Sequence, residues 1–440
     1  MSQTSKRTTK RWTWLFFWLA LVTAVSVGSV GCLTSAYAEG ATPTTGVQSG
    51  AGAVHTQTQS SEQTPAAPPQ QNASASLTDP LVQQQLQQLD LHNFDQFLDE
   101  VVQEYGDYLP PDVKGHVTEL VLHGKLGTLF QGLLTGLLKY LFHELFLNSR
   151  LLGTIIVLTV FAAILENMQS AFEGKNVSKI AHTICFLVLM ILAVQSFAAA
   201  TSYAKDAIAV MVDFMTATIP MYLALLASTG GVASAAMIHP LIVFLINVIG
   251  DLIEFVIFPL IFFSAILSLV SKISSRYQVT QLAGLLKSTA VWVMGVFFTI
   301  FLGVVSVQGA AGAVADGVSI KTAKYVSSNF IPVVGKLFSD AADTVVGASL
   351  IVKNALGITG AGILLLLAAF PALKILSLAI VYNVSSAVMQ PLGDSPIIGC
   401  LSTIGKSLIL VFAALATVGF MFFLAVTVII AAGNLSVMVR

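Results

Sequence analysis

The chain has few charged residues and few cysteines for its 440 residues. Lys, Arg, Asp and Glu make up 10% of it, whereas a soluble domain averages about 25%. The formal net charge of −1 at pH 7 gives no basic surface for binding nucleic acid. The three cysteines form no CxxC pair, which excludes a disulfide framework and a cysteine-based zinc site of the usual spacing.

Long apolar runs fill the C-terminal two-thirds of the chain, and hydrophobic residues make up 55% of the whole. Lipid accepts such runs as helices, because a helix satisfies its own backbone hydrogen bonds. At a minimum of about 18 apolar residues per span, we predict an all-α, polytopic helical membrane protein with about eight spans. The predicted spans are 151–168, 180–201, 207–228, two within 237–271, 282–306, 360–382 and 407–432.

Two parts of this region do not read as plain spans. The run 237–271 is too long for one span at the helical rise per residue, and Asp251 and Glu254 lie in its middle. We therefore predict a hairpin of two spans joined at a polar turn. The region 307–359 mixes lysines and aspartates with small apolar residues. That mixture favours amphipathic, interfacial or re-entrant helices.

Residues 1–38 have the parts of a secretory signal peptide. A basic start precedes the apolar run Trp12–Val30, and Ala36 and Ala38 supply the small residues of a cleavage site before Glu39. An uncleaved anchor is the alternative, since the apolar run is longer than most. In either case the segment that follows is exported.

Two exported segments precede the membrane domain, which we assign to 150–440. Residues 39–80 are rich in small and polar residues and cannot bury enough apolar area to fold, so we predict a disordered linker. Residues 81–149 are predicted to form a small helical extracytoplasmic domain, because apolar residues recur at helical spacing in 94–105 and 126–147. The helix at 126–147 could lie in the membrane surface or pack on its neighbours.

Export of residues 39–149 sets the orientation of the spans. The first span then runs inward, so Lys175 and Lys179 face the cytoplasm. Lys272 and Arg276 join them if 237–271 is a hairpin. Both loops then satisfy the positive-inside bias of membrane proteins.

No catalytic, cofactor-binding or metal-binding motif is found, and we expect neither an enzyme nor a cofactor. Gly399–Ser407 is similar to a phosphate-binding loop but has one residue too many between its glycines. The pair His143-Glu144 lacks the second histidine of a zinc helix, because Leu147 occupies that position.

Four charged residues within apolar segments are the candidate intramembrane or pore-lining polar groups: Asp213, Asp251, Glu254 and Lys374. Each is costly if it faces lipid, so each should face protein, a water-filled cavity or the interface. The functional interpretation is a cation or proton site, or a polar pore lining. The structural interpretation is a solvated turn at Asp251 and Glu254, and a snorkelling or ion-paired Lys374.

Glycines and prolines among the apolar runs are candidate packing or kink positions, because small residues let helices approach closely and proline interrupts a helix. They are Pro220, Gly230, Gly231, Pro332, Gly335 and Gly360.

The order of these parts resembles that of the stage III sporulation protein AE family over about residues 80–440. Local stretches carry the same resemblance, and they are Thr218–Gly231, Asp316–Lys324, Phe330–Gly335 and Ser339–Val345. None of these stretches is a catalytic signature.

The resemblance implies a multi-pass protein of the mother-cell membrane around the forespore, with residues 39–149 extracytoplasmic. Such a protein belongs to a multiprotein transenvelope channel complex that endospore development requires. The implied partners are other stage III sporulation membrane proteins and the lipid bilayer. Two alternatives remain open at this point: an ion-coupled solute permease that uses Asp251, Glu254 or Lys374, and a non-conducting membrane scaffold for the complex.

Overall fold

The computed structural model describes residues 89, 91–110, 126–171, 175–273, 279–330, 334–392 and 396–438. All of them belong to the compact unit 69–440. The predicted signal peptide, with Ala36 and Ala38, and the predicted linker lie outside the described residues.

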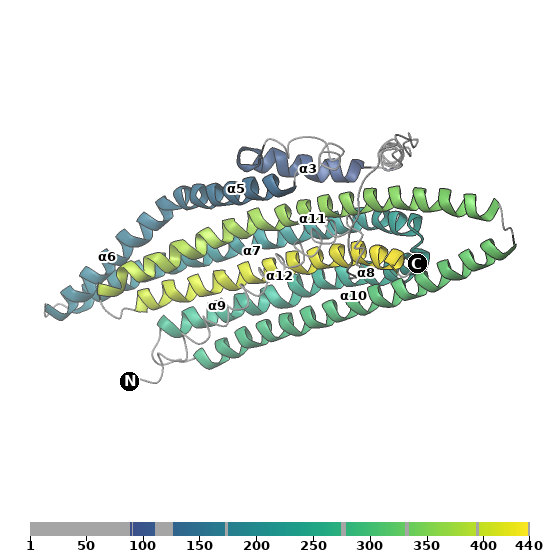
Figure 1. Cartoon of the computed structure of the whole chain (residues 1–440). Coiled ribbons are helices and arrows are strands. Elements are labelled where there is room, and N and C mark those ends of the chain that lie inside the picture. The colour runs from purple at the N-terminus through teal and green to yellow at the C-terminus, as the bar shows by residue number, and fades with distance from the viewer. Residues whose placement is uncertain are drawn as a thin grey trace, which may run out of the picture. The chain divides into compact units, whose positions relative to one another are not determined.

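Every element in the described part of the chain is helical (Figure 1). The elements are α3 (His92–Tyr105), η2 (Gly106–Tyr108), α5 (Leu126–Leu147), α6 (Ser149–Ala171), α7 (Lys175–Ser228), α8 (Val232–Leu252), η4 (Ile253–Ile257), α9 (Phe258–Ile273), α10 (Thr280–Phe330), α11 (Val334–Met389), η5 (Gln390–Leu392) and α12 (Pro396–Met438).

Five helical stretches are long and apolar enough to cross a membrane. They are Thr183–Ser228, Val232–Lys272, Thr280–Thr322, Asp343–Met389 and Pro396–Asn434. A bent pair in α5 and α6 raises the number to six if it counts as one span. The predicted all-α membrane architecture is confirmed in this coarser form, but eight separate spans are not found in the described residues.

The predicted polar turn at Asp251 and Glu254 is wrong. The chain passes from α8 through η4 into α9 without reversing, and Leu252 and Phe258 on either side of η4 keep right-handed helical dihedral angles. η4 is a single π-helical turn. Such a turn takes up an extra residue inside a helix and does not require a loop.

The two spans predicted at 180–201 and 207–228 are one continuous helix, α7. Prolines do not end the helices here, since Pro220, Pro240 and Pro371 all lie inside helices. Contacts with neighbouring helices and local backbone adjustment can compensate for the hydrogen bonds that proline removes from a membrane helix.

The helices predicted for 307–359 are present in the described residues, where they are parts of two long helices. Their predicted amphipathic, interfacial or re-entrant placement stays a prediction. α10 continues as a helix to Phe330, and α11 begins at Val334. Alanine and lysine are both good helix formers, so the mixed composition of this region is compatible with long helices. Pro332 itself lies outside the described residues.

The core of the bundle is formed by α7, α11 and α12, which pack on one another (Figure 1). α10 packs on α12, α9 and α8, and α6 packs on α7 and α11. Glycines permit close approach: a Cβ added at Gly419 in α12 would lie 2.7 Å from the Cβ of Ala368 in α11. Helices in lipid associate through this kind of backbone proximity.

α3 packs on α7 and α11 through aromatic side chains. Phe94 lies edge-on to Phe214 and Tyr222, with ring centroids 5.7 and 5.8 Å apart, and Tyr105 stacks on Phe370 at 4.1 Å. Burial raises the pKa of Tyr105 above its usual range, with a further contribution from the hydrogen bond that its hydroxyl donates to Glu104. Helix 94–105 is therefore present, and its apolar face is covered by the long helices.

α5 packs on α11, as one of the two sequence interpretations expects. Tyr140 and Glu144 are buried on its inner face, whereas Phe142 and Phe146 are exposed on the other. The axis bends by 43° between α5 and α6. Asn148 lies at this bend and donates a hydrogen bond to Ser377 of α11.

Candidate functional site

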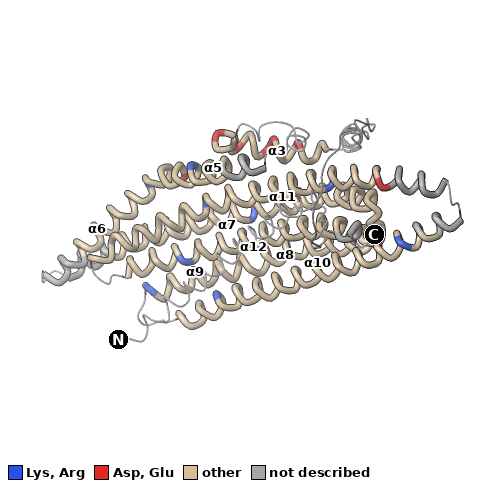
Figure 2. Tube along the Cα trace, in the orientation of Figure 1, with Lys and Arg blue, Asp and Glu red and all other residues tan. Residues whose placement is uncertain are grey.

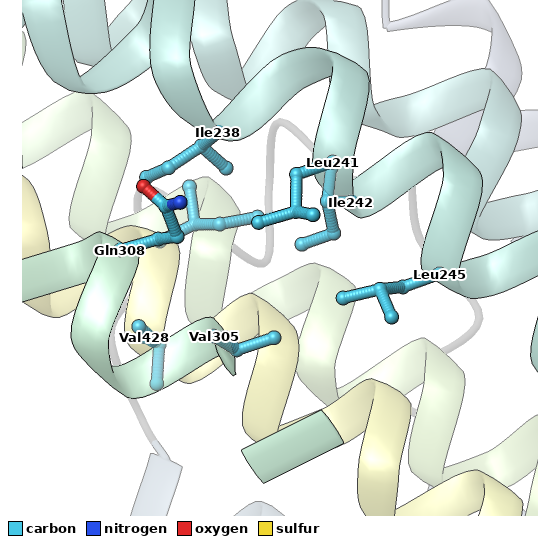
Figure 3. A pocket seen from close by; sticks show the side chains of 8 residues that line it. Ile238, Leu241, Ile242, Leu245, Val305, Gln308 and Val428 are labelled. Carbon is cyan, nitrogen blue, oxygen red and sulfur yellow. The ribbon is translucent and has the colours of Figure 1, made fainter. Parts of the chain in front are cut away.

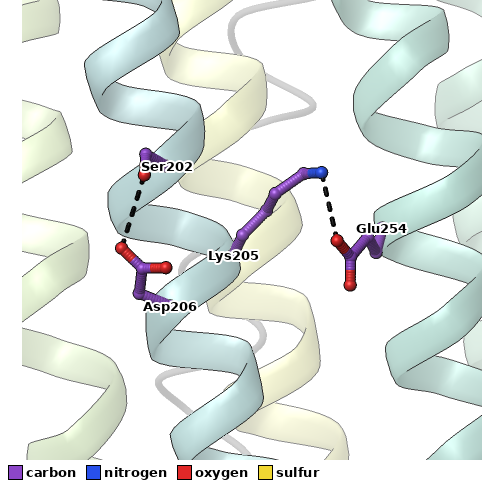
Figure 4. Close-up of polar contacts among 4 residues, drawn as sticks. All are labelled: Ser202, Lys205, Asp206 and Glu254. Carbon is purple, nitrogen blue, oxygen red and sulfur yellow. Dashed lines mark hydrogen bonds and ion pairs between the residues drawn. The ribbon is translucent and has the colours of Figure 1, made fainter.

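Charged side chains are sparse along the long helices (Figure 2). Lys205 of α7 and Glu254 of η4 form an ion pair with an N–O distance of 3.2 Å (Figure 4). In the same part of α7, the hydroxyl of Ser202 donates a hydrogen bond to the carboxylate of Asp206 over 3.4 Å. We call Tyr203, Lys205, Asp206, Asp251, Glu254 and Lys374 the mid-helix belt.

Lys374 of α11 connects a third helix to the belt. Its ammonium group lies 4.3 Å from the centroid of the Tyr203 ring in α7. A cation above an aromatic face gains electrostatic stabilisation from the ring. With Asp251 in α8, the belt therefore extends over α7, α8, η4 and α11.

The belt is open rather than enclosed. The side chains of Lys205 and Glu254 are 38% and 50% exposed, and Asp206 and Asp251 are exposed as well. An ion pair this exposed contributes at most about 1 kcal/mol to folding in water. The arrangement can hold charge at a surface, but it does not surround a ligand.

The four polar residues singled out from the sequence are only partly brought together. Glu254 and Lys374 make the contacts just described, and Asp251, near the end of α8, lies about one turn before Glu254 of η4. Asp213 lies further along α7 and is exposed. Lys205 and Asp206 were missed, because the polar group Ser202–Asp206 was interpreted as the gap between two spans.

The candidate packing residues have different roles. Gly230 has φ of 91°, in the left-handed region that favours glycine, and it forms the turn from α7 to α8. A Cβ on Gly231 would meet the carbonyl oxygen of Leu226 at 2.8 Å, and one on Gly360 would overlap the Tyr222 hydroxyl. Pro220 is an exposed position of α7. Gly335 lies in the first turn of α11, in a part whose side chains are not described.

A small pocket lies between α8, α10 and α12 (Figure 3). Aliphatic side chains line it together with Gln308, so it offers no charged group to a ligand. Within the described residues, no group of three or more His, Cys, Asp or Glu side chains could hold a metal ion. Gly399 and Gly405, of the loop-like motif, lie inside α12 rather than in a loop.

Long apolar helices with a few charges midway along them define a polytopic helical membrane protein. Residues 112–433 match the family of stage III sporulation protein AE. The chain is 51% identical over 352 residues to stage III sporulation protein AE of Bacillus subtilis (strain 168), covering 80% of this chain and 88% of that protein. No solved structure matches the chain. The chain therefore belongs to the stage III sporulation protein AE family.

Proposed function

We propose that this chain is a membrane component of a multiprotein channel complex between mother cell and forespore, and that endospore development requires it. The observation that carries this proposal is the family match across nearly the whole helical bundle. The presence of several helices long enough to cross a membrane supports the interpretation that this is a multi-pass membrane protein. The proposed location is the mother-cell membrane around the forespore, with residues 39–149 extracytoplasmic.

The proposed partners are other stage III sporulation membrane proteins, and the proposed role is not enzymatic. Exposed apolar side chains such as Phe244 of α8 and Val307 of α10 offer area that lipid or protein partners can cover. Large exposed apolar surface is a feature of interaction sites.

An ion-coupled permease is the less favoured function. Transporters of that kind bind substrate and coupling ions between helices near the middle of the membrane. Here the carboxylates of Asp251 and Glu254 are exposed at the outside of the bundle. A coupling role for them therefore lacks the enclosing site that it needs.

Gene deletion followed by complementation tests the proposal. Deleting the gene should arrest sporulation after engulfment while vegetative growth stays normal, and the wild-type gene should restore spores. A gene carrying Asp251→Asn and Glu254→Gln should restore spores too, because a complex component does not need these charges to couple ions. Loss of a vegetative transport activity on deletion would contradict the proposal and favour the permease.

A further inference from the structure

The long helices exceed the thickness of a bilayer. The five candidate spans contain 39 to 47 residues, which at the helical rise corresponds to about 60 to 70 Å. The hydrocarbon core of a membrane is about 30 Å thick. Tilts of up to about 40° remove only a small part of this difference. Only part of each helix can therefore lie in lipid.

One half of the bundle has the length and the surface that a bilayer requires. The rise is about 33 Å from Thr183 to Lys205 and about 27 Å from Glu254 to Lys272. Large apolar side chains are exposed throughout this half, which we call the lipid half. They include Val157, Phe161, Ile184, Leu187, Ile191 and Phe263.

The other half of α7 has a different outer surface. Between Ala204 and Ser228, α7 exposes no large hydrophobic side chain. Its exposed positions follow one helix face and carry small or polar residues: Asp206, Ala209, Asp213, Thr216, Pro220 and Ala224. Charged residues at the centre of a bilayer are costly, so this face does not suit contact with lipid.

The position of α3 also indicates that this half of the bundle lies outside the lipid. Its apolar face covers Phe214, Tyr222 and Phe370, all beyond the belt from the lipid half. Its outer face carries acidic residues (Figure 2), of which Asp99, Glu100 and Glu104 are exposed. Hydrocarbon cannot solvate this face, so water must reach the bundle at the level of α3.

The bend between α5 and α6 lies at the level where the surroundings of the bundle change from water to lipid. Asn148, at the bend, bonds to Ser377, which lies one turn from Lys374 of the belt. α6 continues from there for 23 residues, a rise of about 33 Å that matches the hydrocarbon thickness. The exposed rings of Phe142 and Phe146 lie in the last turns of α5, next to this level.

We propose that the bilayer surrounds only the lipid half of the bundle, that the mid-helix belt lies at one membrane–water boundary, and that the other half projects beyond the lipid with α3 on its side. The Lys205–Glu254 pair and Tyr203 then lie where charged and aromatic side chains are stable, at the interface. From Asp206 to Ser228, α7 projects by about 33 Å. On this half, α8 and α10 also expose large apolar side chains, among them Phe244 and Val307, and these require a protein cover in the assembled complex.

Depth measurements on matched positions of α7 test this placement. The purified full-length chain, with its native cysteines replaced by serine, is placed in nanodiscs and carries one new cysteine at a time. Ala209→Cys and Thr216→Cys probe the projecting half, and Leu187→Cys and Ile191→Cys are the controls in the lipid half. All four positions are exposed on the same helix, so a fluorescent label does not disturb the core.

Lipids brominated on their acyl chains should quench labels at Leu187 and Ile191 and should fail to quench those at Ala209 and Thr216. A water-soluble maleimide should show the opposite order of reaction rates. Size-exclusion chromatography verifies that each variant is folded. Quenching at Thr216 as strong as at Ile191 would overturn the placement. This test needs no sporulating cell, so its outcome is independent of the proposed channel complex.

Discussion

Asp316 of α10 caps the start of α8 at Ser234. One carboxylate oxygen accepts the backbone N–H of Ala233 at 2.8 Å, and the other accepts that of Ser234 at 3.2 Å. Asp316 is 1% exposed, so water cannot replace it. The free N–H groups at the start of a helix carry partial positive charge, which a carboxylate stabilises.

Replacing Asp316 should therefore destabilise the junction between α8 and α10. We expect Asp316→Ala to lower the free energy of unfolding by about 1 to 3 kcal/mol, because it leaves buried N–H groups without an acceptor. Asp316→Asn should cost less, since its amide oxygen still accepts one of the bonds. Thermal unfolding of the purified chain in detergent measures both. Equal melting temperatures for wild type and Asp316→Ala would show that the cap contributes nothing.

The sequence alone indicates helices and a membrane, but it does not indicate contacts between distant segments. Asp316 and Ala233 are 83 positions apart, and no local pattern connects them. The same limit applies to the belt, because Lys205 and Glu254 meet only after α7 and η4 pack together. Helix propensity and hydrophobic periodicity are local signals, whereas these contacts depend on the packing of the whole bundle.

Two errors in the predicted topology compensate for each other. Polar residues at 202–206 were interpreted as a loop, and Asp251 and Glu254 as a turn, yet both groups lie within continuous helices. Each error adds one span. α9 consequently ends at the end of the bundle where α7 begins, as the predicted topology requires (Figure 1). Lys272 lies in the last turn of α9.

Gly360 and Gly362 of α11 allow a controlled test of helix packing. A Cβ on Gly360 would overlap the hydroxyl of Tyr222 and approach Phe94 to 2.9 Å, whereas one on Gly362 meets nothing within 4 Å. Gly360→Ala should therefore cost about 1 to 3 kcal/mol from overpacking. Gly362→Ala should stabilise slightly, by up to about 1 kcal/mol, because alanine favours the helix.

Unfolding midpoints of the two variants, measured side by side in one detergent, provide the comparison. If both alanines lower the midpoint equally, the close contact at Gly360 has no energetic role. The same pair also tests the attachment of α3, since Phe94 belongs to that helix. Limited proteolysis should cut near α3 faster in Gly360→Ala than in Gly362→Ala.

Lys353 and Gly433 are coupled at the end of the bundle. The ammonium group of Lys353, whose side chain is 1% exposed, donates to the carbonyl of Ile430 at 2.9 Å and to the side chain of Asn434 at 3.2 Å. A Cβ on Gly433 would overlap this ammonium group. Gly433→Ala should therefore weaken the packing of α12 on α11 and lower the free energy of unfolding. The loss should be smaller when Lys353 is replaced by Met.

A double-mutant cycle measures this coupling, which we expect at about 0.5 to 3 kcal/mol. Gly347→Ala, at an open position of α11, is the control and should not depend on residue 353. Additive effects of Lys353→Met and Gly433→Ala would mean that the two side chains do not share space in the folded protein.

Export of the segment before the bundle is a prediction from sequence that labelling can test. If residues 39–149 face the space between mother cell and forespore, Ser61→Cys and Ser76→Cys should react with an impermeant thiol reagent that reaches this space. Ser275→Cys, in the predicted cytoplasmic loop that follows Lys272, is the matched control and should react only after permeabilisation. The positive-inside bias predicts this difference, because Lys272 and Arg276 flank the control site. Protection of both serine positions, with verified access of the reagent, would reverse the orientation of every helix described above.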